Sequence, residues 1–305
     1  MPSATGTAKA RNAAAARPIA LIAGSAHYDI VARPAQDLDV IDQPGDVSVE
    51  IGGTACNVAL NLANLGIPCR FLTAMGPGVL SGLVAKTLVD SGIDTRIVES
   101  VTLPTALFSA HLDASGEMRS AITSTPVERH RFAASNVLEA LNGTKVLILD
   151  CNLSGTDLDL MTRAANGLDI PVFVLGVSEP KVVRVLAITG RIEGLFLNRR
   201  EALHLQKECK PPHTRYEGLA KTLRTTLFVT RDADGAAIVT TVGIETVPTP
   251  PVPFRGNRLG GGDGFAAGVL YYLLQGKTRF EAARLAVETA RDILSRDGCN
   301  LAASQ

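Results

Sequence analysis

A glycine-rich stretch that ends in an acidic residue, RLGGGDGF at residues 258–265, is the segment whose residue types could most directly do chemistry. Glycines lack a Cβ, so the backbone N–H groups of Gly260, Gly261 and Gly262 can approach an anion closely. An apolar, helix-length run follows, and the N-terminus of a helix favours negative charge. Asp263 would then lie beside the anion, where its carboxylate can take a proton from an attacking hydroxyl. The alternative is a flexible connection in which Asp263 only caps the helix.

A second glycine pair precedes another helical pattern in IGGTACNVALNLANLG, residues 51–66. Gly52 and Gly53 would let bare backbone approach a ligand, and Asn57 in the first turn of the helix could hydrogen-bond that ligand. The alternative is a turn ahead of a packed helix. The phosphate-binding pattern GxxxxGK[ST] is absent, and no GxGxxG opens a helix directly after the first strand. P-loop and dinucleotide-binding folds therefore lose support.

Short apolar runs that alternate with helical patterns must position these residues. The runs with the length of buried strands are residues 18–25, 145–150, 170–176, 194–198 and 226–230. The helical stretches between them include residues 55–66, 81–92 and 135–143, each ending at a glycine. This alternation predicts an α/β, doubly wound, mostly parallel sheet flanked by helices. Ligands bind such sheets at the carboxyl ends of the strands.

Two segments, about 30–50 and 105–123, break the alternation with extended runs, and we expect them to form a small β lid over the main sheet. The lid segments and the sheet would together make one domain over residues 18–305. Residues 1–17 hold three basic residues, no acidic residue and many alanines. We expect a disordered tail there, with an organelle transit segment as the alternative.

The overall composition excludes several classes of protein. Thirty Lys and Arg balance thirty Asp and Glu, so no net charge attracts the chain to nucleic acid or to an anionic membrane. No apolar run reaches the roughly 18 residues that span a bilayer. The five cysteines are far apart and the five histidines have no metal-ligand spacing. We expect a cytoplasmic protein that acts on a small molecule.

Four motifs in order give the sequence a family resemblance. They are GSAHYD at residues 24–29, the GGxxxN block at residues 52–57, the NxxE block at residues 198–201 and the GxGD block at residues 260–263. In this order the sequence resembles the ribokinase-like (PfkB) family of carbohydrate and nucleoside kinases. Within the family it is similar to the pseudouridine kinases, in stretches such as LDCNLS (149–154) and LNRREA (197–202), and in Asn257.

The resemblance implies a role for each matching residue. Asp263 would deprotonate the 5′-hydroxyl of the substrate, and the amides of Gly260, Gly261 and Gly262 would form the anion hole. On the substrate side, Asp29, Gly52, Gly53 and Asn57 would hold the sugar hydroxyls, and Asn152 would lie near the phosphate in transfer. The nucleotide side would comprise Asn198, Thr230 and Gly235, with Glu201 organising Mg²⁺ through water. The implied cosubstrate is ATP, and the implied product is pseudouridine 5′-phosphate.

Some residues depart from the family pattern and keep other functions open. Pro77 and Gly78 stand where the family usually has an acidic pair, and Leu259 precedes the GxGD block. The substrate could be another nucleoside or ribose, or the chain could bind a nucleoside without catalysis. A nicotinamide-dependent dehydrogenase is a more distant alternative. The exposed edges of a β lid could pair across a homodimer.

Overall fold

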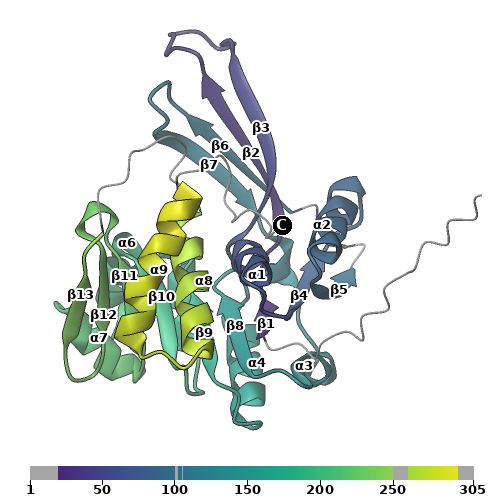
Figure 1. Ribbon diagram of the computed structural model, residues 1–305. Helices are drawn as coiled ribbons and strands as arrows, with labels where there is room; N and C mark the ends of the chain where they lie inside the picture. The colour runs from purple at the N-terminus through teal and green to yellow at the C-terminus, as the bar shows by residue number, and fades with distance from the viewer. Residues whose placement is uncertain (1–19, 100–101, 105, 250–259, 295–305) are drawn as a thin grey trace, which may run out of the picture.

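The computed structural model describes residues 20–99, 102–104, 106–249 and 260–294 (Figure 1). The expected tail at residues 1–17 lies outside the described residues, as do Asn257 and Leu259. Within the described ranges, no helix is long and apolar enough to cross a membrane.

The predicted mostly parallel sheet is confirmed, and nine of the described strands form it in the order β13-β12-β11-β10-β9-β8-β1-β4-β5. Only the ladders between β11 and β12 and between β12 and β13 are antiparallel. The strands are β1 (Ala20–Ala23), β4 (Cys69–Met75), β5 (Asp94–Glu99), β8 (Val146–Asp150), β9 (Val172–Leu175), β10 (Gly194–Asn198), β11 (Thr226–Thr230), β12 (Ala236–Val239) and β13 (Ile244–Val247).

Helices cover both faces of this sheet, because side chains alternate between two buried cores along each strand. In β1, Ile22 packs into one core and Leu21 into the other. The first core includes side chains of α1 (Thr54–Asn64), α2 (Val79–Asp90), α8 (Gly261–Leu274) and α9 (Arg279–Leu294), and α1, α8 and α9 lie in front of the sheet in Figure 1.

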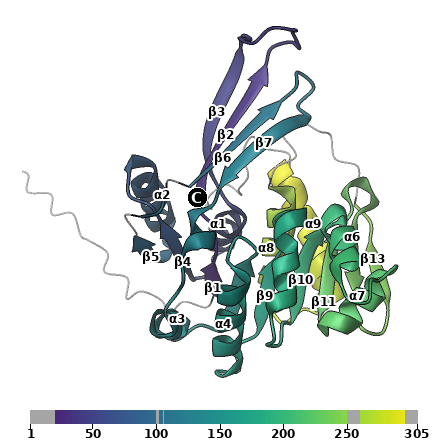
Figure 2. The same ribbon diagram turned by 180° about the vertical axis from the view of Figure 1, so that it is seen from behind.

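The opposite face carries the remaining described helices (Figure 2). They are α3 (Ala134–Leu141), α4 (Gly155–Asn166), α5 (Glu179–Val182), α6 (Arg199–Glu208) and α7 (Tyr216–Leu223), with the short 3₁₀ helices η1 (Pro126–Arg129) and η2 (Val183–Ala187). A further 3₁₀ helix, η3 (Asp232–Asp234), lies in the turn between β11 and β12.

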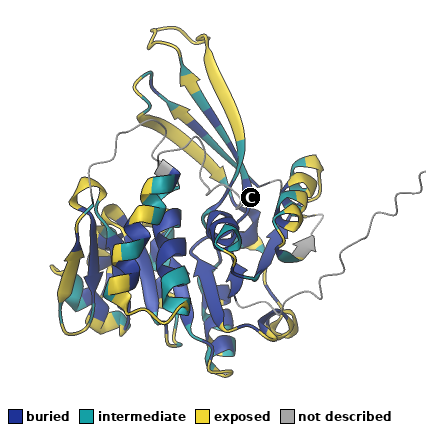
Figure 3. Ribbon diagram, in the orientation of Figure 1, coloured by how far each residue is buried: buried dark blue, intermediate teal, exposed yellow. Residues whose placement is uncertain are grey.

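A second, four-stranded sheet in the order β3-β2-β6-β7 rises above the first (Figure 1). Its strands are β2 (His27–Pro34), β3 (Gly45–Gly52), β6 (Leu107–Leu112) and β7 (Met118–Ser124). We call it the small sheet. Alternate residues of β2 face opposite sides, so His27 and Asp29 are buried on one side. The tips of the small sheet are exposed (Figure 3), and Val47, Val49 and Ile122 are exposed within its strands.

Candidate active site

The carboxyl ends of the parallel strands bring together residues that are far apart in the sequence. Ser25 follows β1, Asp150 ends β8, Asn198 ends β10 and Thr230 ends β11. These strands are parallel neighbours or lie within the same run of parallel strands, so their carboxyl ends share one edge of the sheet. This is the edge at which the sequence predicts a ligand.

Asp263 lies in the first turn of α8, at the start of the helix that follows the three glycines. Gly260 is the residue that precedes the helix, with a left-handed φ of 83°, so Asp263 does not cap it. Asn57 Nδ2 of α1 donates a hydrogen bond of 2.8 Å to Asp263 Oδ2. The first N–H groups of a helix have no intrahelical acceptor. The two glycine motifs of the sequence therefore meet at this carboxylate.

The surroundings of Asp263 disfavour its charged form. Burial raises the pKa of Asp263 to about 7, and the negative charges of Asp150, Asp29 and Glu201 act in the same direction. The hydrogen bond from Asn57 acts in the opposite direction and is the weaker influence. A general base works best when its pKa lies near the working pH, so this carboxylate is suited to accept a proton near neutrality.

Asp150 was not singled out from the sequence. Its carboxylate connects the end of β8 to the segments that contain Ser25 and Ala55. Its Oδ2 accepts hydrogen bonds from Ser25 N at 3.1 Å, Ser25 Oγ at 3.0 Å and Ala55 N at 3.2 Å. Asp150 is fully buried, and a Cβ on Gly24 would collide with its carboxylate. The sequence signal was an acidic residue directly after an apolar run. Asp150 therefore fixes the start of α1, which carries Asn57.

Asn152 lies beside Asp150 and is buried. Its Nδ2 donates to Ser25 Oγ at 2.7 Å and to Asp150 Oδ2 at 3.0 Å, while its backbone N donates to Asp150 Oδ1 at 3.0 Å. The predicted substrate residue is thus held rigidly at the edge of the sheet.

The other predicted substrate residues gather where the small sheet meets α1. Gly52 lies so close to Asp29 that a Cβ would collide with the Asp29 carboxylate. Gly53 precedes α1 with φ 103°, and a Cβ there would lie 2.7 Å from Ser25 O. Both glycines are therefore required by close packing, and their predicted contact with a ligand stays a prediction.

Three buried polar atoms here have no hydrogen-bond partner among the described residues. Asp29 Oδ1 still has an ion pair with His27, whereas the other two, Asn57 Oδ1 and His27 Nδ1, have no such contact. His27 Nε2 lies 3.1 Å from Asp29 Oδ1. Buried polar atoms usually have a partner, so these two atoms are available to the hydroxyl or amide groups of a ligand.

Asn198 and Glu201 form a reciprocal cap at the start of α6. Asn198 Oδ1 accepts from Glu201 N at 2.9 Å, and Glu201 Oε2 accepts from Asn198 N at 2.9 Å. Glu201 is buried, and a Cβ on Gly176 would collide with its carboxylate. Burial raises the pKa of Glu201 to about 7, and the charge of Glu179 acts in the same direction.

Thr230 and Gly235 flank the turn that connects β11 and β12. Thr230 Oγ1 donates to Leu197 O at 3.4 Å, and Gly235 has a left-handed φ of 78°. A Cβ on Gly235 would collide with the carbonyl of Val247. Arg199 Nη1 lies 3.3 Å from Asp234 Oδ2 and links this turn to α6. Their predicted contacts with a nucleotide stay a prediction.

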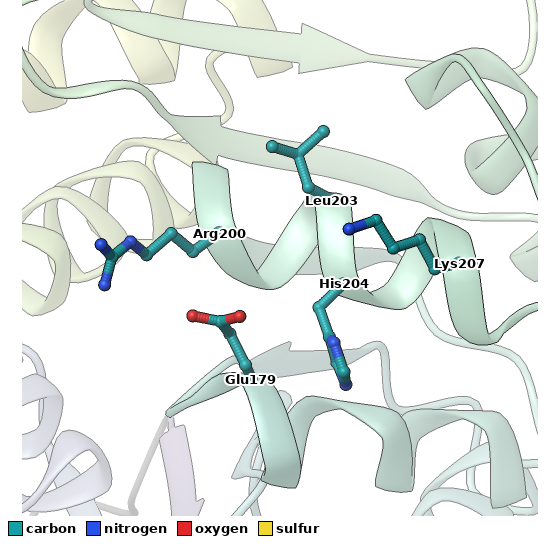
Figure 4. Close-up of a pocket in the computed structure, with 5 residues that line it drawn as sticks. All are labelled: Glu179, Arg200, Leu203, His204 and Lys207. Atoms are coloured by element: carbon teal, nitrogen blue, oxygen red, sulfur yellow. The ribbon is translucent and has the colours of Figure 1, made fainter.

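A separate groove of about 380 Å³ lies between α5 and α6 (Figure 4). It is lined by Glu179, Arg200, Leu203, His204 and Lys207. None of the predicted site residues is among these five, so the groove is distinct from the site around Asp263.

The chain is similar to several known proteins. The family model "pfkB family carbohydrate kinase" matches residues 20–305. Pseudouridine kinase of Escherichia coli (strain K12) is 31% identical over 189 residues, which are 60% of this chain and 59% of that protein. Guanosine-inosine kinase of Exiguobacterium acetylicum is 22% identical over 268 residues, which are 82% of this chain and 86% of that protein.

The solved structures show the same fold. The Arabidopsis thaliana ribokinase structure complexed with ribose and ATP has a TM-score of 0.76 at 19% identity, covering 93% of this chain and 94% of that one. The ribokinase-like fold predicted from the sequence is thereby confirmed. With the family model covering the described sheet, the glycine motifs and Asp263, the chain belongs to the pfkB family of carbohydrate kinases.

Proposed function

We propose that this protein transfers the γ-phosphoryl group of ATP to the 5′-hydroxyl of pseudouridine. The observation that carries the proposal is the position of Asp263, whose carboxylate is held by Asn57 beside the N-terminus of a glycine-led helix. Asp263 takes the proton of the hydroxyl, and the first amides of α8 stabilise the charge that develops on the phosphoryl group. A protein that only binds a nucleoside has no need of a base with a pKa near 7.

The nucleotide would lie along the edge formed by β10 and β11, between Asn198, Thr230 and Gly235. Mg²⁺ is usually held by phosphate oxygens, waters and one or two carboxylates. Glu201 is the carboxylate suited to hold it through water, because its buried charge has an elevated pKa and gains from a nearby cation. Mg²⁺ would neutralise phosphate charge during transfer.

The ribosyl hydroxyls would be held where Asp29 and Asn57 meet. Asp29 is a buried residue of β2 in the small sheet, and Asn57 Oδ1 has a free acceptor position among the described contacts. Asn152 would contact the group in transfer. Asp29 can accept from two hydroxyls, which favours a substrate with vicinal hydroxyls over a deoxy sugar.

Pseudouridine is favoured over other nucleosides by the similarity to the Escherichia coli pseudouridine kinase. The similarity to the guanosine-inosine kinase covers more of this chain at lower identity and makes a purine nucleoside the second candidate. Both candidates present the same 5′-hydroxyl to Asp263, so the base and the anion hole are common to them.

The test measures ADP release from Mg·ATP with pseudouridine, uridine, guanosine, inosine, adenosine and ribose. Asp263→Asn is assayed beside Asp90→Asn, which removes an exposed carboxylate from α2. We expect turnover with pseudouridine, lost in Asp263→Asn and kept in Asp90→Asn, and a product that phosphorus NMR identifies as a 5′-phosphate. Preference for another nucleoside would refute the pseudouridine assignment and keep the kinase. Absence of turnover with every acceptor would refute the kinase proposal for this set of substrates.

A further inference from the structure

A lysine outside the four ordered motifs enters the same network of hydrogen bonds. Lys181 lies in α5, just after β9, and is half-buried. Its Nζ donates to Asn152 Oδ1 at 2.6 Å and to Thr125 Oγ1 at 2.9 Å. Both acceptors are uncharged, and the ion pairs among the described residues do not include Lys181. An ammonium group has three N–H donors, so one donor remains.

The network connects this ammonium group to the predicted base. Asn152 accepts from Lys181 and donates to Asp150, so one amide joins the two. The charge of Asp150 acts on the pKa of Lys181 and also on the pKa of Asp263. Lys181 and Asp263 are therefore both influenced by the same buried carboxylate, which ends β8 at the carboxyl edge of the sheet.

The neighbouring arginine, Arg184, uses its donors for contacts within the protein. Arg184 Nη1 donates to the carbonyl oxygens of Cys151 and Asn152 at 3.1 Å and of Leu153 at 3.2 Å, and Nη2 lies 2.9 Å from Glu128 Oε2. These contacts use its donors to hold the loop after β8. Lys181 is thus the cation of this cluster that keeps a donor for a ligand.

The carboxylates of the site make a cation favourable there. Asp263 is influenced by three other carboxylates, those of Asp150, Asp29 and Glu201. A phosphoryl group that enters this region brings further negative charge. Burial lowers the pKa of Lys181, while Glu128 and Asp150 act in the opposite direction. A half-buried ammonium group without a direct anionic partner is stabilised when an anion binds to it.

We propose that Lys181 is a catalytic residue whose third N–H donates to a non-bridging oxygen of the phosphoryl group in transfer, beside Asn152. This inference rests on the proposed phosphoryl transfer. In that step a bond forms between the acceptor oxygen and the γ-phosphorus, and the bond from the γ-phosphorus to the β,γ-bridging oxygen breaks. The proton of the hydroxyl passes to Asp263, and the bond electrons leave with ADP. Lys181 keeps its proton and offsets the charge of the phosphoryl oxygens.

The first test needs no turnover. Lys181→Met and Lys181→Arg are compared with wild type for binding of ADP and of the β,γ-imido analogue of ATP by titration calorimetry with Mg²⁺. Only the analogue has a γ-phosphoryl group. We therefore expect Lys181→Met to lower the affinity for the analogue by about tenfold relative to the affinity for ADP, as for a lost charge-assisted hydrogen bond. Lys181→Arg should retain part of the preference for the ATP analogue over ADP. An unchanged ratio of the two affinities in Lys181→Met would overturn the inference.

The second test uses the acceptor that the wild-type protein phosphorylates. Lys181→Met should lower kcat by about 100-fold, with a KM for the acceptor within a few-fold of wild type, because the contact serves the phosphoryl group in transfer. Lys86→Met, which removes an exposed lysine from α2, is the matched control and should keep wild-type kcat. Equal thermal midpoints would exclude unfolding. A kcat near the wild-type value, or a loss confined to the acceptor KM, would refute the role of Lys181. Wild-type inactivity would count against the proposed function, and the affinity ratio would still decide on Lys181.

Discussion

Replacing Asp263 by Asn is expected to make the protein more stable while abolishing its activity. Burial and three neighbouring carboxylates raise the pKa of Asp263 from 3.8 to about 7. Each pKa unit corresponds to about 1.4 kcal/mol, so the full shift corresponds to about 4 kcal/mol of unfavourable free energy when the group is charged. Asp263 is partly exposed to solvent, so we expect roughly half of this, about 2 kcal/mol, to be recovered in Asp263→Asn. Asn can still accept the hydrogen bond from Asn57.

The gain must depend on pH in a defined direction. Because the folded protein binds this proton more tightly than the unfolded chain does, charging Asp263 destabilises the fold increasingly as pH rises from about 4 to about 7. Below that window the carboxyl is protonated in both states, and the destabilisation is absent. Above it, the destabilisation is complete. The stability difference between Asp263→Asn and wild type should therefore be larger at pH 8.5 than at pH 5.5.

Urea unfolding of the ligand-free proteins at these two pH values measures the difference, and Asp90→Asn controls for loss of a surface carboxylate. The same preparations give the activity, where loss of a general base should lower kcat by about 10²- to 10⁴-fold. An Asp263→Asn protein that is equally or less stable than wild type at pH 8.5 would show that the electrostatic description of this site is wrong. Retained turnover would show that Asp263 is not the base.

Further substitutions test the contacts around this carboxylate. In Asn57→Ala the pKa of Asp263 should rise further, because the hydrogen bond that lowers this pKa is lost. In a plot of kcat/KM against pH, the midpoint of the acid limb, expected near pH 7 in wild type, should shift to higher pH by about one unit. Gly24→Ala should lower the free energy of unfolding by about 2 kcal/mol or more, measured by urea denaturation, because the new methyl group collides with Asp150. Glu201→Ala loses the reciprocal cap with Asn198, so its free energy of unfolding should be about 1 kcal/mol lower than that of wild type. The variant should also need more Mg²⁺ for half-maximal activity. An unchanged Mg²⁺ titration would exclude a role of Glu201 at the metal.

The alternation of strands and helices was predictable because each element leaves a local pattern. The search for continuous apolar runs did not find β4, because this strand contains Arg70 although it is buried along its whole length. Arg70 Nε donates to Asp94 Oδ2 at 2.7 Å, and Nη1 donates to Ala140 O at 2.7 Å, at the end of α3. These partners come from two other segments and make a buried guanidinium tolerable. The sequence around Arg70 contains no sign of them.

The candidate site shows the same division between local and distant information. Residue type and local spacing were enough to single out Asn57 and Asp263, but their hydrogen bond joins residues 206 positions apart and depends on the packing of α1 against α8. Asp150 was visible as an acidic residue at a strand end. Its importance comes from donors at Ser25 and Ala55, on two distant segments that only the folded chain brings together.

The position of α8 and α9 on the same face as α1 has a consequence for synthesis on the ribosome. The interior strand β1 and helix α1 are made early, whereas α8 begins at Gly261 and α9 ends at Leu294. Until these last two helices leave the exit tunnel, the apolar side chains of the first core that pack against them remain uncovered, including those on the α1 surface that faces α8. The nascent chain therefore exposes a large apolar surface for most of its translation, which makes it a natural client for chaperones. A chain terminated before Gly261 would lack both Asp263 and the side chains that α8 and α9 contribute to the first core.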